Sequence, residues 1–231
     1  MSSDELFKPI SRNGLLLGLF AIVTTGLVVL TFTVSEDRIL EQQRRVKEKA
    51  LFQLIPEQAM DNVLLEDTLP INARELLADG TSDLAYIARK DGDVVGVILP
   101  LISTEGYSGK IGLIVGINAD GSLAGVRILS HRETPGLGDK VDLNKSDWLL
   151  NFDGKSLQQP TLKNWKVKKD GGEFDQLTGA TITPRAIVKA VKKALVYFAE
   201  HKELLADKPV AVKTAKDNAA TDKATTEKAG E

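Results

Sequence analysis

From Asn13 to Ser35 the chain carries no charged side chain, and the apolar run GLLLGLFAIVTTGLVVLTFTV fills most of this stretch. A helix rises about 1.5 Å per residue, so a run of this length crosses a hydrocarbon core of roughly 30 Å. A cleaved signal peptide has a shorter apolar run that ends in small residues, whereas this run leads straight into Glu36-Asp37-Arg38. The sequence therefore predicts an uncleaved transmembrane helix at residues 13–35, after a short cytoplasmic segment at 1–12.

The charges that flank this span do not fix its orientation. Lys8 and Arg12 precede it, and four basic residues follow it closely: Arg38, Arg44, Arg45 and Lys47. Taken literally, the excess of positive charge on the second side favours a cytoplasmic location for the rest of the chain. That rule is calibrated on short loops, however, and long domains cross a membrane largely regardless of their charge.

The composition excludes several kinds of binding site. The 231 residues include no cysteine, and the only two histidines, His131 and His201, lie far apart in sequence. Thiolate-bound iron–sulfur clusters, attached c-type haem and ordinary structural zinc therefore lack ligands. The net charge is −2 and the basic residues are scattered, which argues against nucleic acid as a partner. A redox role would require an organic carrier.

The remaining sequence predicts an α+β domain, an antiparallel sheet flanked by helices. Residues 36–56 are predicted to form a juxtamembrane helix that Pro56 stops. Between Leu84 and Ser130 follow four β-branched runs separated by turn residues, which is typical of an antiparallel meander: AYIARK, DVVGVILPLI, KIGLIVGIN and SLAGVRILS. In the third run large apolar residues alternate with smaller ones, as expected of a sheet with one face on a core.

Two further segments complete this prediction. From Pro184 to Leu205 apolar residues recur at helical spacing, with lysines on the other side, which predicts an amphipathic helix that covers the sheet. Residues 207–231 alternate Ala, Lys, Thr, Asp and Glu, and have too little apolar content to form a core. They are predicted to be a disordered charged tail.

The segment between Asp175 and Arg185 is the most informative for function. Thr183 followed by Pro184 is typical of a helix start, with the hydroxyl capping free amides and proline at the first helical position. In that interpretation Gly179 is only a tight turn before the helix. It leaves unexplained the small and hydroxylated residues just upstream, where free amides and the positive helix end favour a phosphate: Thr178, Gly179, Ala180 and Thr181.

The pattern Asp175-x-x-Thr178-Gly179-Ala180-Thr181 resembles the D-x-x-[ST]-G-A-[ST] flavinylation motif of the FMN-binding domain family. In that family the last Ser or Thr of the motif is esterified by the phosphate of FMN, and by position this acceptor is Thr181. The resemblance implies one covalent FMN per chain in a domain at residues 57–206. It also implies a separate flavin transferase that uses FAD and a divalent metal, because the sequence places no obvious base beside Thr181.

Two loops extend the resemblance. The segments TEGYSGKI (104–111) and HRETPGLG (131–138) are similar to the loops that the family places around the flavin ring. The resemblance implies that they contribute apolar contacts from Tyr107 and Leu137 and polar groups from Glu133 and Thr134. Thr104 and Gly106 belong to the same predicted set. Taken alone, both segments are typical of simple glycine and Pro-Gly turns.

As a whole, residues 10–205 resemble the G subunits of the Rnf (Rsx) ion-translocating electron transport complexes, which are related to the C subunits of sodium-translocating NADH:quinone reductases. The resemblance implies an electron-relay subunit in a bacterial inner membrane, with a periplasmic domain and the other proteins of the complex as partners. A single helix cannot enclose an ion path, so ion movement would belong to those partners. A cofactor-free bitopic envelope adaptor is the alternative. A flavin reductase acting alone is a third, although no GxGxxG nicotinamide fingerprint is present.

Overall fold

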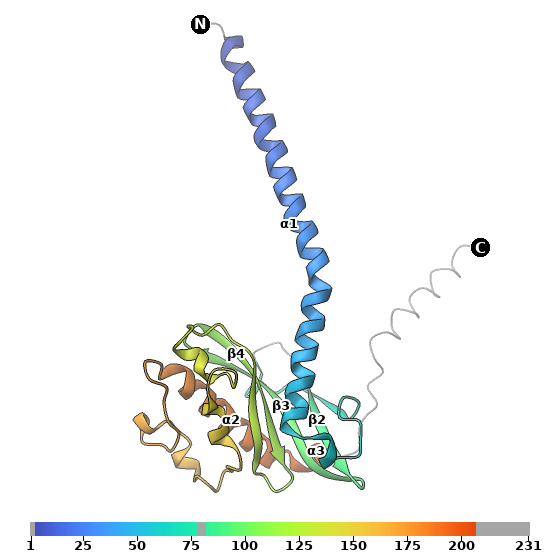
Figure 1. The fold of residues 1–231 in the computed structure, drawn as a ribbon, viewed down its shortest axis with the longest axis vertical. Helices are drawn as coiled ribbons and strands as arrows, with labels where there is room; N and C mark the ends of the chain where they lie inside the picture. The colour runs from blue at the N-terminus through green and yellow to red at the C-terminus, as the bar shows by residue number, and fades with distance from the viewer. Residues whose placement is uncertain (1–2, 78–81, 207–231) are drawn as a thin grey trace, which may run out of the picture. The chain divides into compact units, whose positions relative to one another are not determined.

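The computed structural model describes residues 3–77 and 82–206, so the predicted tail at 207–231 lies outside the described residues. The chain divides into two compact units, with the boundary between Glu48 and Lys49. Figure 1 shows the elements of both units.

Helix α1 runs from Ser3 to Leu54, and its part up to Glu48 forms the first unit. Its apolar part is long and apolar enough to span a membrane. Three threonine hydroxyls within that part donate to carbonyls of their own helix: Thr24 to Phe20, Thr31 to Leu27 and Thr33 to Val29. These polar groups therefore need no water, which is the condition for placing them in lipid.

Beyond the apolar part, α1 becomes a charged helix. Arg44 Nε lies 2.8 Å from Glu48 Oε1, and Arg45 Nη2 lies 2.6 Å from Glu41 Oε1. Such i,i+4 pairs each contribute about 0.3–0.5 kcal/mol to an exposed helix. The predicted span and juxtamembrane helix are thus parts of one continuous helix.

The second unit contains a five-stranded antiparallel sheet in the order β1-β2-β3-β4-β5, which confirms the predicted α+β class and meander. Its strands are β1 Thr68–Ile71, β2 Asp83–Lys90, β3 Asp93–Gly106, β4 Gly109–Asn118 and β5 Leu123–Ser130. The four predicted runs correspond to β2 through β5, whereas β1 was not predicted. Short connections join β2 to β3, β3 to β4 and β4 to β5, and each of these three hairpins is held by its own antiparallel ladder.

Helix α2, Ile182–Glu200, packs on one face of this sheet against β3 and β4, as predicted, and the short α3, Lys202–Ala206, follows it. The large core between α2 and the sheet takes alternate residues of each strand, including Leu99 of β3 and Val115 of β4, both fully buried. Side chains alternate across a strand, so this face accounts for the periodicity seen in the sequence.

The opposite face is also covered, which corrects the expectation of a one-sided sheet. Leu51 and Leu54 at the end of α1 pack with Ile98 and Ile114, the residues that point away from α2. This contact is close: a Cβ built on Gly116 would lie 3.1 Å from the Cβ of Leu54. The end of α1 therefore belongs to the core of the second unit.

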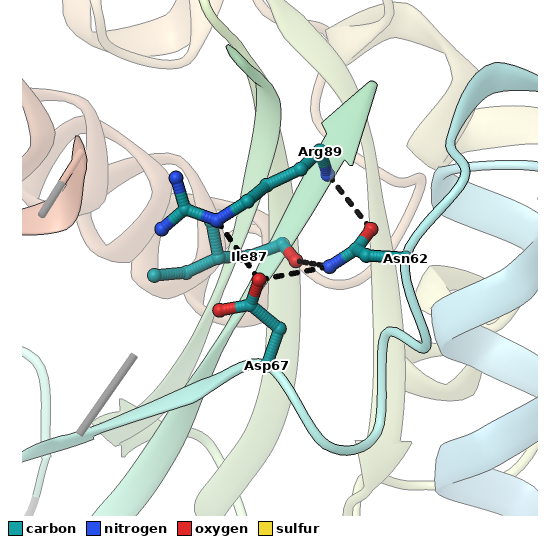
Figure 2. Close-up of polar contacts among 4 residues, drawn as sticks. All are labelled: Asn62, Asp67, Ile87 and Arg89. Carbon is teal, nitrogen blue, oxygen red and sulfur yellow. Dashed lines mark hydrogen bonds and ion pairs between the residues drawn. The ribbon is translucent and has the colours of Figure 1, made fainter. Parts of the chain in front are cut away.

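A buried polar network attaches the segment before β1 to strand β2 (Figure 2). The amide nitrogen of Asn62 donates to Asp67 Oδ2 at 3.0 Å and to the Ile87 carbonyl at 2.8 Å, while its oxygen accepts from the backbone N–H of Arg89 at 2.8 Å. Arg89 Nε donates to the same Asp67 oxygen at 2.9 Å. Because both ionic side chains are nearly buried, the pair is protected from screening by salt.

Between β5 and α2 the chain forms four 3-10 helices, η2 Gly138–Val141, η3 Asp147–Phe152, η4 Leu162–Asn164 and η5 Lys168–Asp170; a fifth, η1 Glu57–Ala59, follows α1. An aromatic cluster holds this region together. The rings of Phe152 and Phe174 stack at 4.7 Å, with Trp148 and Trp165 against them. Both tryptophans are buried, as predicted for core residues.

Candidate functional site

A pocket of about 290 Å³ lies where three separate segments of the second unit meet. The β3–β4 turn contributes Tyr107, and the loop after β5 contributes residues 133, 134, 137 and 138. The third segment, 179–183, leads into α2. The complete lining is Tyr107, Glu133, Thr134, Leu137, Gly138, Gly179, Ala180, Thr181, Ile182 and Thr183.

The start of α2 gives this pocket a set of unused hydrogen-bond donors. Thr181 is the N-cap residue, yet its side chain makes no capping hydrogen bond. In the described part of the chain, the backbone N–H groups of Thr181, Ile182 and Thr183 have no acceptor, and the first α-helical bond runs from Arg185 N to Thr181 O at 3.2 Å. Free amides and the positive end of the helix dipole favour an anion at this position.

Gly179 shapes the approach to that helix start. Its φ of +80° lies in the left-handed region, which other residues rarely adopt. A Cβ at this position would also lie 2.9 Å from Leu137 Cδ2. The backbone of the motif can therefore turn tightly against the loop after β5 only with glycine here.

The prediction that Thr183 caps the helix is wrong. Thr183 is fully buried inside the first turn of α2, and its hydroxyl donates to Glu133 Oε2 at 2.5 Å. The other carboxylate oxygen, Oε1, accepts the N–H of Ser108 at 3.0 Å. The N-cap position consequently falls on Thr181, two residues earlier than the Thr-Pro pattern indicates.

The segment before the motif is anchored to the aromatic cluster. The indole N–H of Trp148 donates to the carbonyl of Asp175 at 2.7 Å, and Asp175 also pairs with Lys168 at 2.7 Å. Within the motif the N–H of Ala180 donates to Leu177 O at 3.0 Å, which closes a turn around Gly179. These contacts fix the position of the segment at 175–180, which leads directly into Thr181.

Arg185 joins the first turn of α2 to η5. Its guanidinium makes two hydrogen bonds to Asp170, at 2.6 and 2.8 Å. The hydrogen bond from Arg185 lowers the pKa of the Asp170 carboxyl, and the positive charges of Arg185, Lys166 and Lys169 lower it further. This surface ion pair therefore links η5, which precedes the motif at 175–181, to the first turn of α2, which follows the motif.

The structure brings seven of the ten predicted site residues to the pocket: Tyr107, Glu133, Thr134, Leu137, Gly179, Ala180 and Thr181. The other three do not line it. Thr178 is exposed at the turn, and Thr104 faces a separate groove beside α2. Gly106 lies behind Glu133, and a Cβ there would be 2.8 Å from Glu133 Oε1.

Sequence reasoning missed three residues that line the pocket, Gly138, Ile182 and Thr183. Gly138 and Thr183 flank the Glu133 carboxylate: a Cβ on Gly138 would lie 2.9 Å from both Glu133 Oε2 and Thr183 Oγ1. The glycine after Leu137 indicates that another group approaches the backbone closely there. The sequence does not show that this group includes Thr183, because Thr183 lies in a distant segment. Ile182 carried no signal beyond its place after the motif.

The lining suits a ligand with one anionic end and one flat apolar part. The pocket combines free amides and the unengaged Thr181 hydroxyl with the apolar side chains of Tyr107, Leu137 and Ile182, which expose 68%, 42% and 44% of their surface. Residues 3–77 and 82–206 contain no group of three or more metal-binding side chains. His131 Nδ1 accepts the N–H of Glu133 at 3.1 Å. The phosphate and the ring of FMN fit this combination of polar and apolar groups.

Comparisons with known proteins agree with this geometry. Residues 106–196 match the model of the FMN-binding domain, and residues 1–54 match the RnfG N-terminal region. The chain is similar to the G subunit of the ion-translocating oxidoreductase complex of Pseudomonas aeruginosa strain UCBPP-PA14, with 51% identity over 194 residues, covering 84% of this chain and 91% of the relative. The corresponding protein of Shewanella oneidensis is 48% identical over 203 residues (88% and 96%), and that of Vibrio vulnificus 43% over 205 residues (89% and 97%). The chain therefore belongs to the family of G subunits of ion-translocating oxidoreductase complexes.

Proposed function

We propose that this chain is the electron-relay subunit of an Rnf-type ion-translocating complex, with one FMN linked through its phosphate to the hydroxyl of Thr181. When bound, FMN supplies one- and two-electron redox chemistry. The observation that carries this proposal is the helix start itself, where a threonine hydroxyl free of hydrogen bonds lies beside unused amides at a pocket.

The linkage forms by transfer of a nucleotidyl group. Thr181 Oγ attacks the phosphorus on the FMN side of the FAD pyrophosphate, the P–O bond to the AMP half breaks, and AMP leaves. The hydroxyl loses its proton, and no electrons are exchanged with the protein. None of the residues that line the pocket with Thr181 is a histidine or lysine that could serve as a base, which supports attachment by a separate flavin transferase.

The other lining residues divide by chemistry. Leu137, Tyr107 and Ile182 provide apolar surface for the ring, and Thr134 offers a hydroxyl at the loop after β5. The amides of residues 181–183 hold the phosphate oxygens that do not form the ester. Glu133 faces the same pocket, but both of its oxygens already accept protein hydrogen bonds.

The location of the domain is part of the same proposal. Residues 13–35 span a bacterial inner membrane once, residues 1–12 stay in the cytoplasm, and the domain at 57–206 faces the periplasm. A tethered domain keeps a covalent cofactor close to the membrane proteins with which it exchanges electrons. The names of the relatives, which describe one subunit of a complex, support such partners.

The test is made on the full chain produced together with a flavin transferase. After denaturing electrophoresis the wild-type band is expected to fluoresce under ultraviolet light, and Thr181→Val is expected to be dark. Thr181→Ser is expected to keep the signal, because serine retains the attacking oxygen. Mass analysis of the peptide containing residue 181 is expected to show the added mass of an FMN phosphoester.

Thr161→Val is the matched control, since it removes an exposed threonine hydroxyl that makes no capping hydrogen bond and lies outside the motif. It is expected to remain fluorescent. A dark wild-type band with an unmodified peptide would reject the covalent flavin and favour a cofactor-free adaptor. A fluorescent Thr181→Val band would place the linkage on another residue.

A further inference from the structure

Glu133 is a buried carboxylate that connects the three segments of the pocket. Only 4% of its surface is exposed, and it lies in the loop after β5. Its Oε1 accepts the N–H of Ser108 in the β3–β4 turn, and its Oε2 accepts the hydroxyl of Thr183 in α2. Both oxygens act as acceptors, which is what an ionised carboxylate offers.

Two neighbouring glycines leave room for the carboxylate of Glu133. A Cβ on Gly106 would approach Oε1 to 2.8 Å, and a Cβ on Gly138 would approach Oε2 to 2.9 Å. Real Cβ atoms essentially never lie so close, so both glycines make room for the carboxylate. The chain thus provides two glycines, a backbone donor and a hydroxyl around one side chain.

The local sequence of α2 offers two competing helix starts. With Thr183 as the N-cap and Pro184 at the first helical position, the Thr-Pro pair would form a favourable start. The structure has the other start, in which Ile182 and Thr183 are helical and Thr181 is the N-cap without a capping hydrogen bond. A threonine that donates its hydroxyl to a buried carboxylate inside the first turn is not available as an N-cap.

We propose that Glu133 is a positioning residue that sets the start of α2: by holding the Thr183 hydroxyl, it makes the helix begin at Ile182 and leaves Thr181 at the N-cap among free amides. The functional purpose of this arrangement rests on the proposed function. A helix that started at Pro184 would not present free backbone N–H groups beside the Thr181 hydroxyl, the proposed acceptor of FMN. Its structural content holds with or without flavin.

The backbone N–H of Arg185 reports which start is used. It donates to Thr181 O only when the helix begins at Ile182. Amide hydrogen exchange is therefore measured at Arg185 in the full chain, in detergent micelles, made without a flavin transferase. In Glu133→Ala, exchange at Arg185 is expected to be about tenfold or more faster than in wild type, because the released Thr183 hydroxyl caps the shorter helix at the N–H of Ala186, its N3 residue, and the Arg185 N–H loses its bond to Thr181 O.

The double variant Glu133→Ala with Thr183→Val separates positioning from simple destabilisation. Valine cannot cap, so the competing start is lost and protection of the Arg185 amide is expected to return toward the wild-type value. A merely structural role predicts the opposite, with faster exchange in the double variant. Where Glu133→Ala does not fold, Glu133→Gln is used in both comparisons, since glutamine keeps the shape but only one acceptor oxygen.

Glu105→Ala is the matched control. Glu105 is also a carboxylate that reaches α2, where it pairs with Lys189 at 2.5 Å, but this pair is about half exposed. Its loss is expected to leave exchange at Arg185 unchanged. Wild-type exchange in the folded Glu133 variant, or faster exchange in the double variant than in the single one, would overturn the proposal. Because no flavin is present, this result is independent of the test of Thr181.

Discussion

Two threonines two positions apart, Thr181 and Thr183, have opposite roles in this structure. The hydroxyl of Thr183 is buried and donates to Glu133, whereas the hydroxyl of Thr181 has no hydrogen bond and lines a pocket. Residue type alone cannot separate them, since both can cap a helix. The difference comes from a carboxylate 50 residues before Thr183 in the chain that contacts only one of them.

At the same scale, the polar network of Figure 2 gives a prediction about stability. Asp67→Ala is expected to lower the free energy of unfolding of the second unit by about 3 kcal/mol, because it leaves the nearly buried Arg89 guanidinium without this carboxylate. Urea denaturation of the full chain measures this change. Glu66→Ala, one residue earlier and exposed, is the control and should change stability by less than about 0.5 kcal/mol. If Asp67→Ala also lowers the free energy of unfolding by less than about 0.5 kcal/mol, the ion pair between Asp67 and Arg89 contributes little to stability.

The position of Thr181 could be predicted from the sequence, but only some of the other residues that line the pocket could be. The motif is local, so the candidate acceptor follows from its spacing. Gly138 and Thr183 contribute through contacts with Glu133, which join segments that only the folded sheet brings together. Thr104 was predicted from its neighbours in sequence, yet it faces another groove, because β3 continues to Gly106 before the chain turns.

At the scale of elements, strands β2 to β5 were predictable because β-branched runs and turn residues alternate along the chain. Strand β1 was not, since it has only four residues and contains Pro70. The covered second face of the sheet was also missed. The sequence of α1 indicates a membrane span followed by a charged helix, and only the structure shows that Leu51 and Leu54 at its end belong to the domain core.

The aromatic cluster allows a prediction for the region before the motif. Phe152 is fully buried and stacks on Phe174, so Phe152→Ala is expected to cost about 3–5 kcal/mol of stability by leaving a cavity. Leu150→Ala in the same 3-10 helix is the control, because Leu150 is 43% exposed. In thermal unfolding, Phe152→Ala should have a far lower melting temperature than Leu150→Ala. Equal melting temperatures would show that the aromatic cluster does not stabilise this region.

For the whole molecule, two features indicate opposite sides of the membrane for the domain. The basic residues after the span favour the cytoplasm, and the proposed function favours the periplasm. Charge counting is weakest for a case like this one, in which a long folded domain follows a single span. The absence of cysteine from the entire chain makes a direct measurement possible, since any introduced thiol is the only one present.

Lys163→Cys places that thiol on an exposed residue of η4, and Ser11→Cys places one in the segment before the span. With a membrane-impermeant maleimide added to intact cells, the cysteine at 163 is expected to react and the cysteine at 11 to stay unmodified, because only the periplasm is reached through the outer membrane. After the cells are lysed, both should react, which controls for the accessibility of each thiol. Labelling at 11 and protection at 163 would place the domain in the cytoplasm and contradict the proposed location, while leaving the chemistry at Thr181 unaffected. The orientation and the flavin linkage are therefore separate claims, and each can fail without the other.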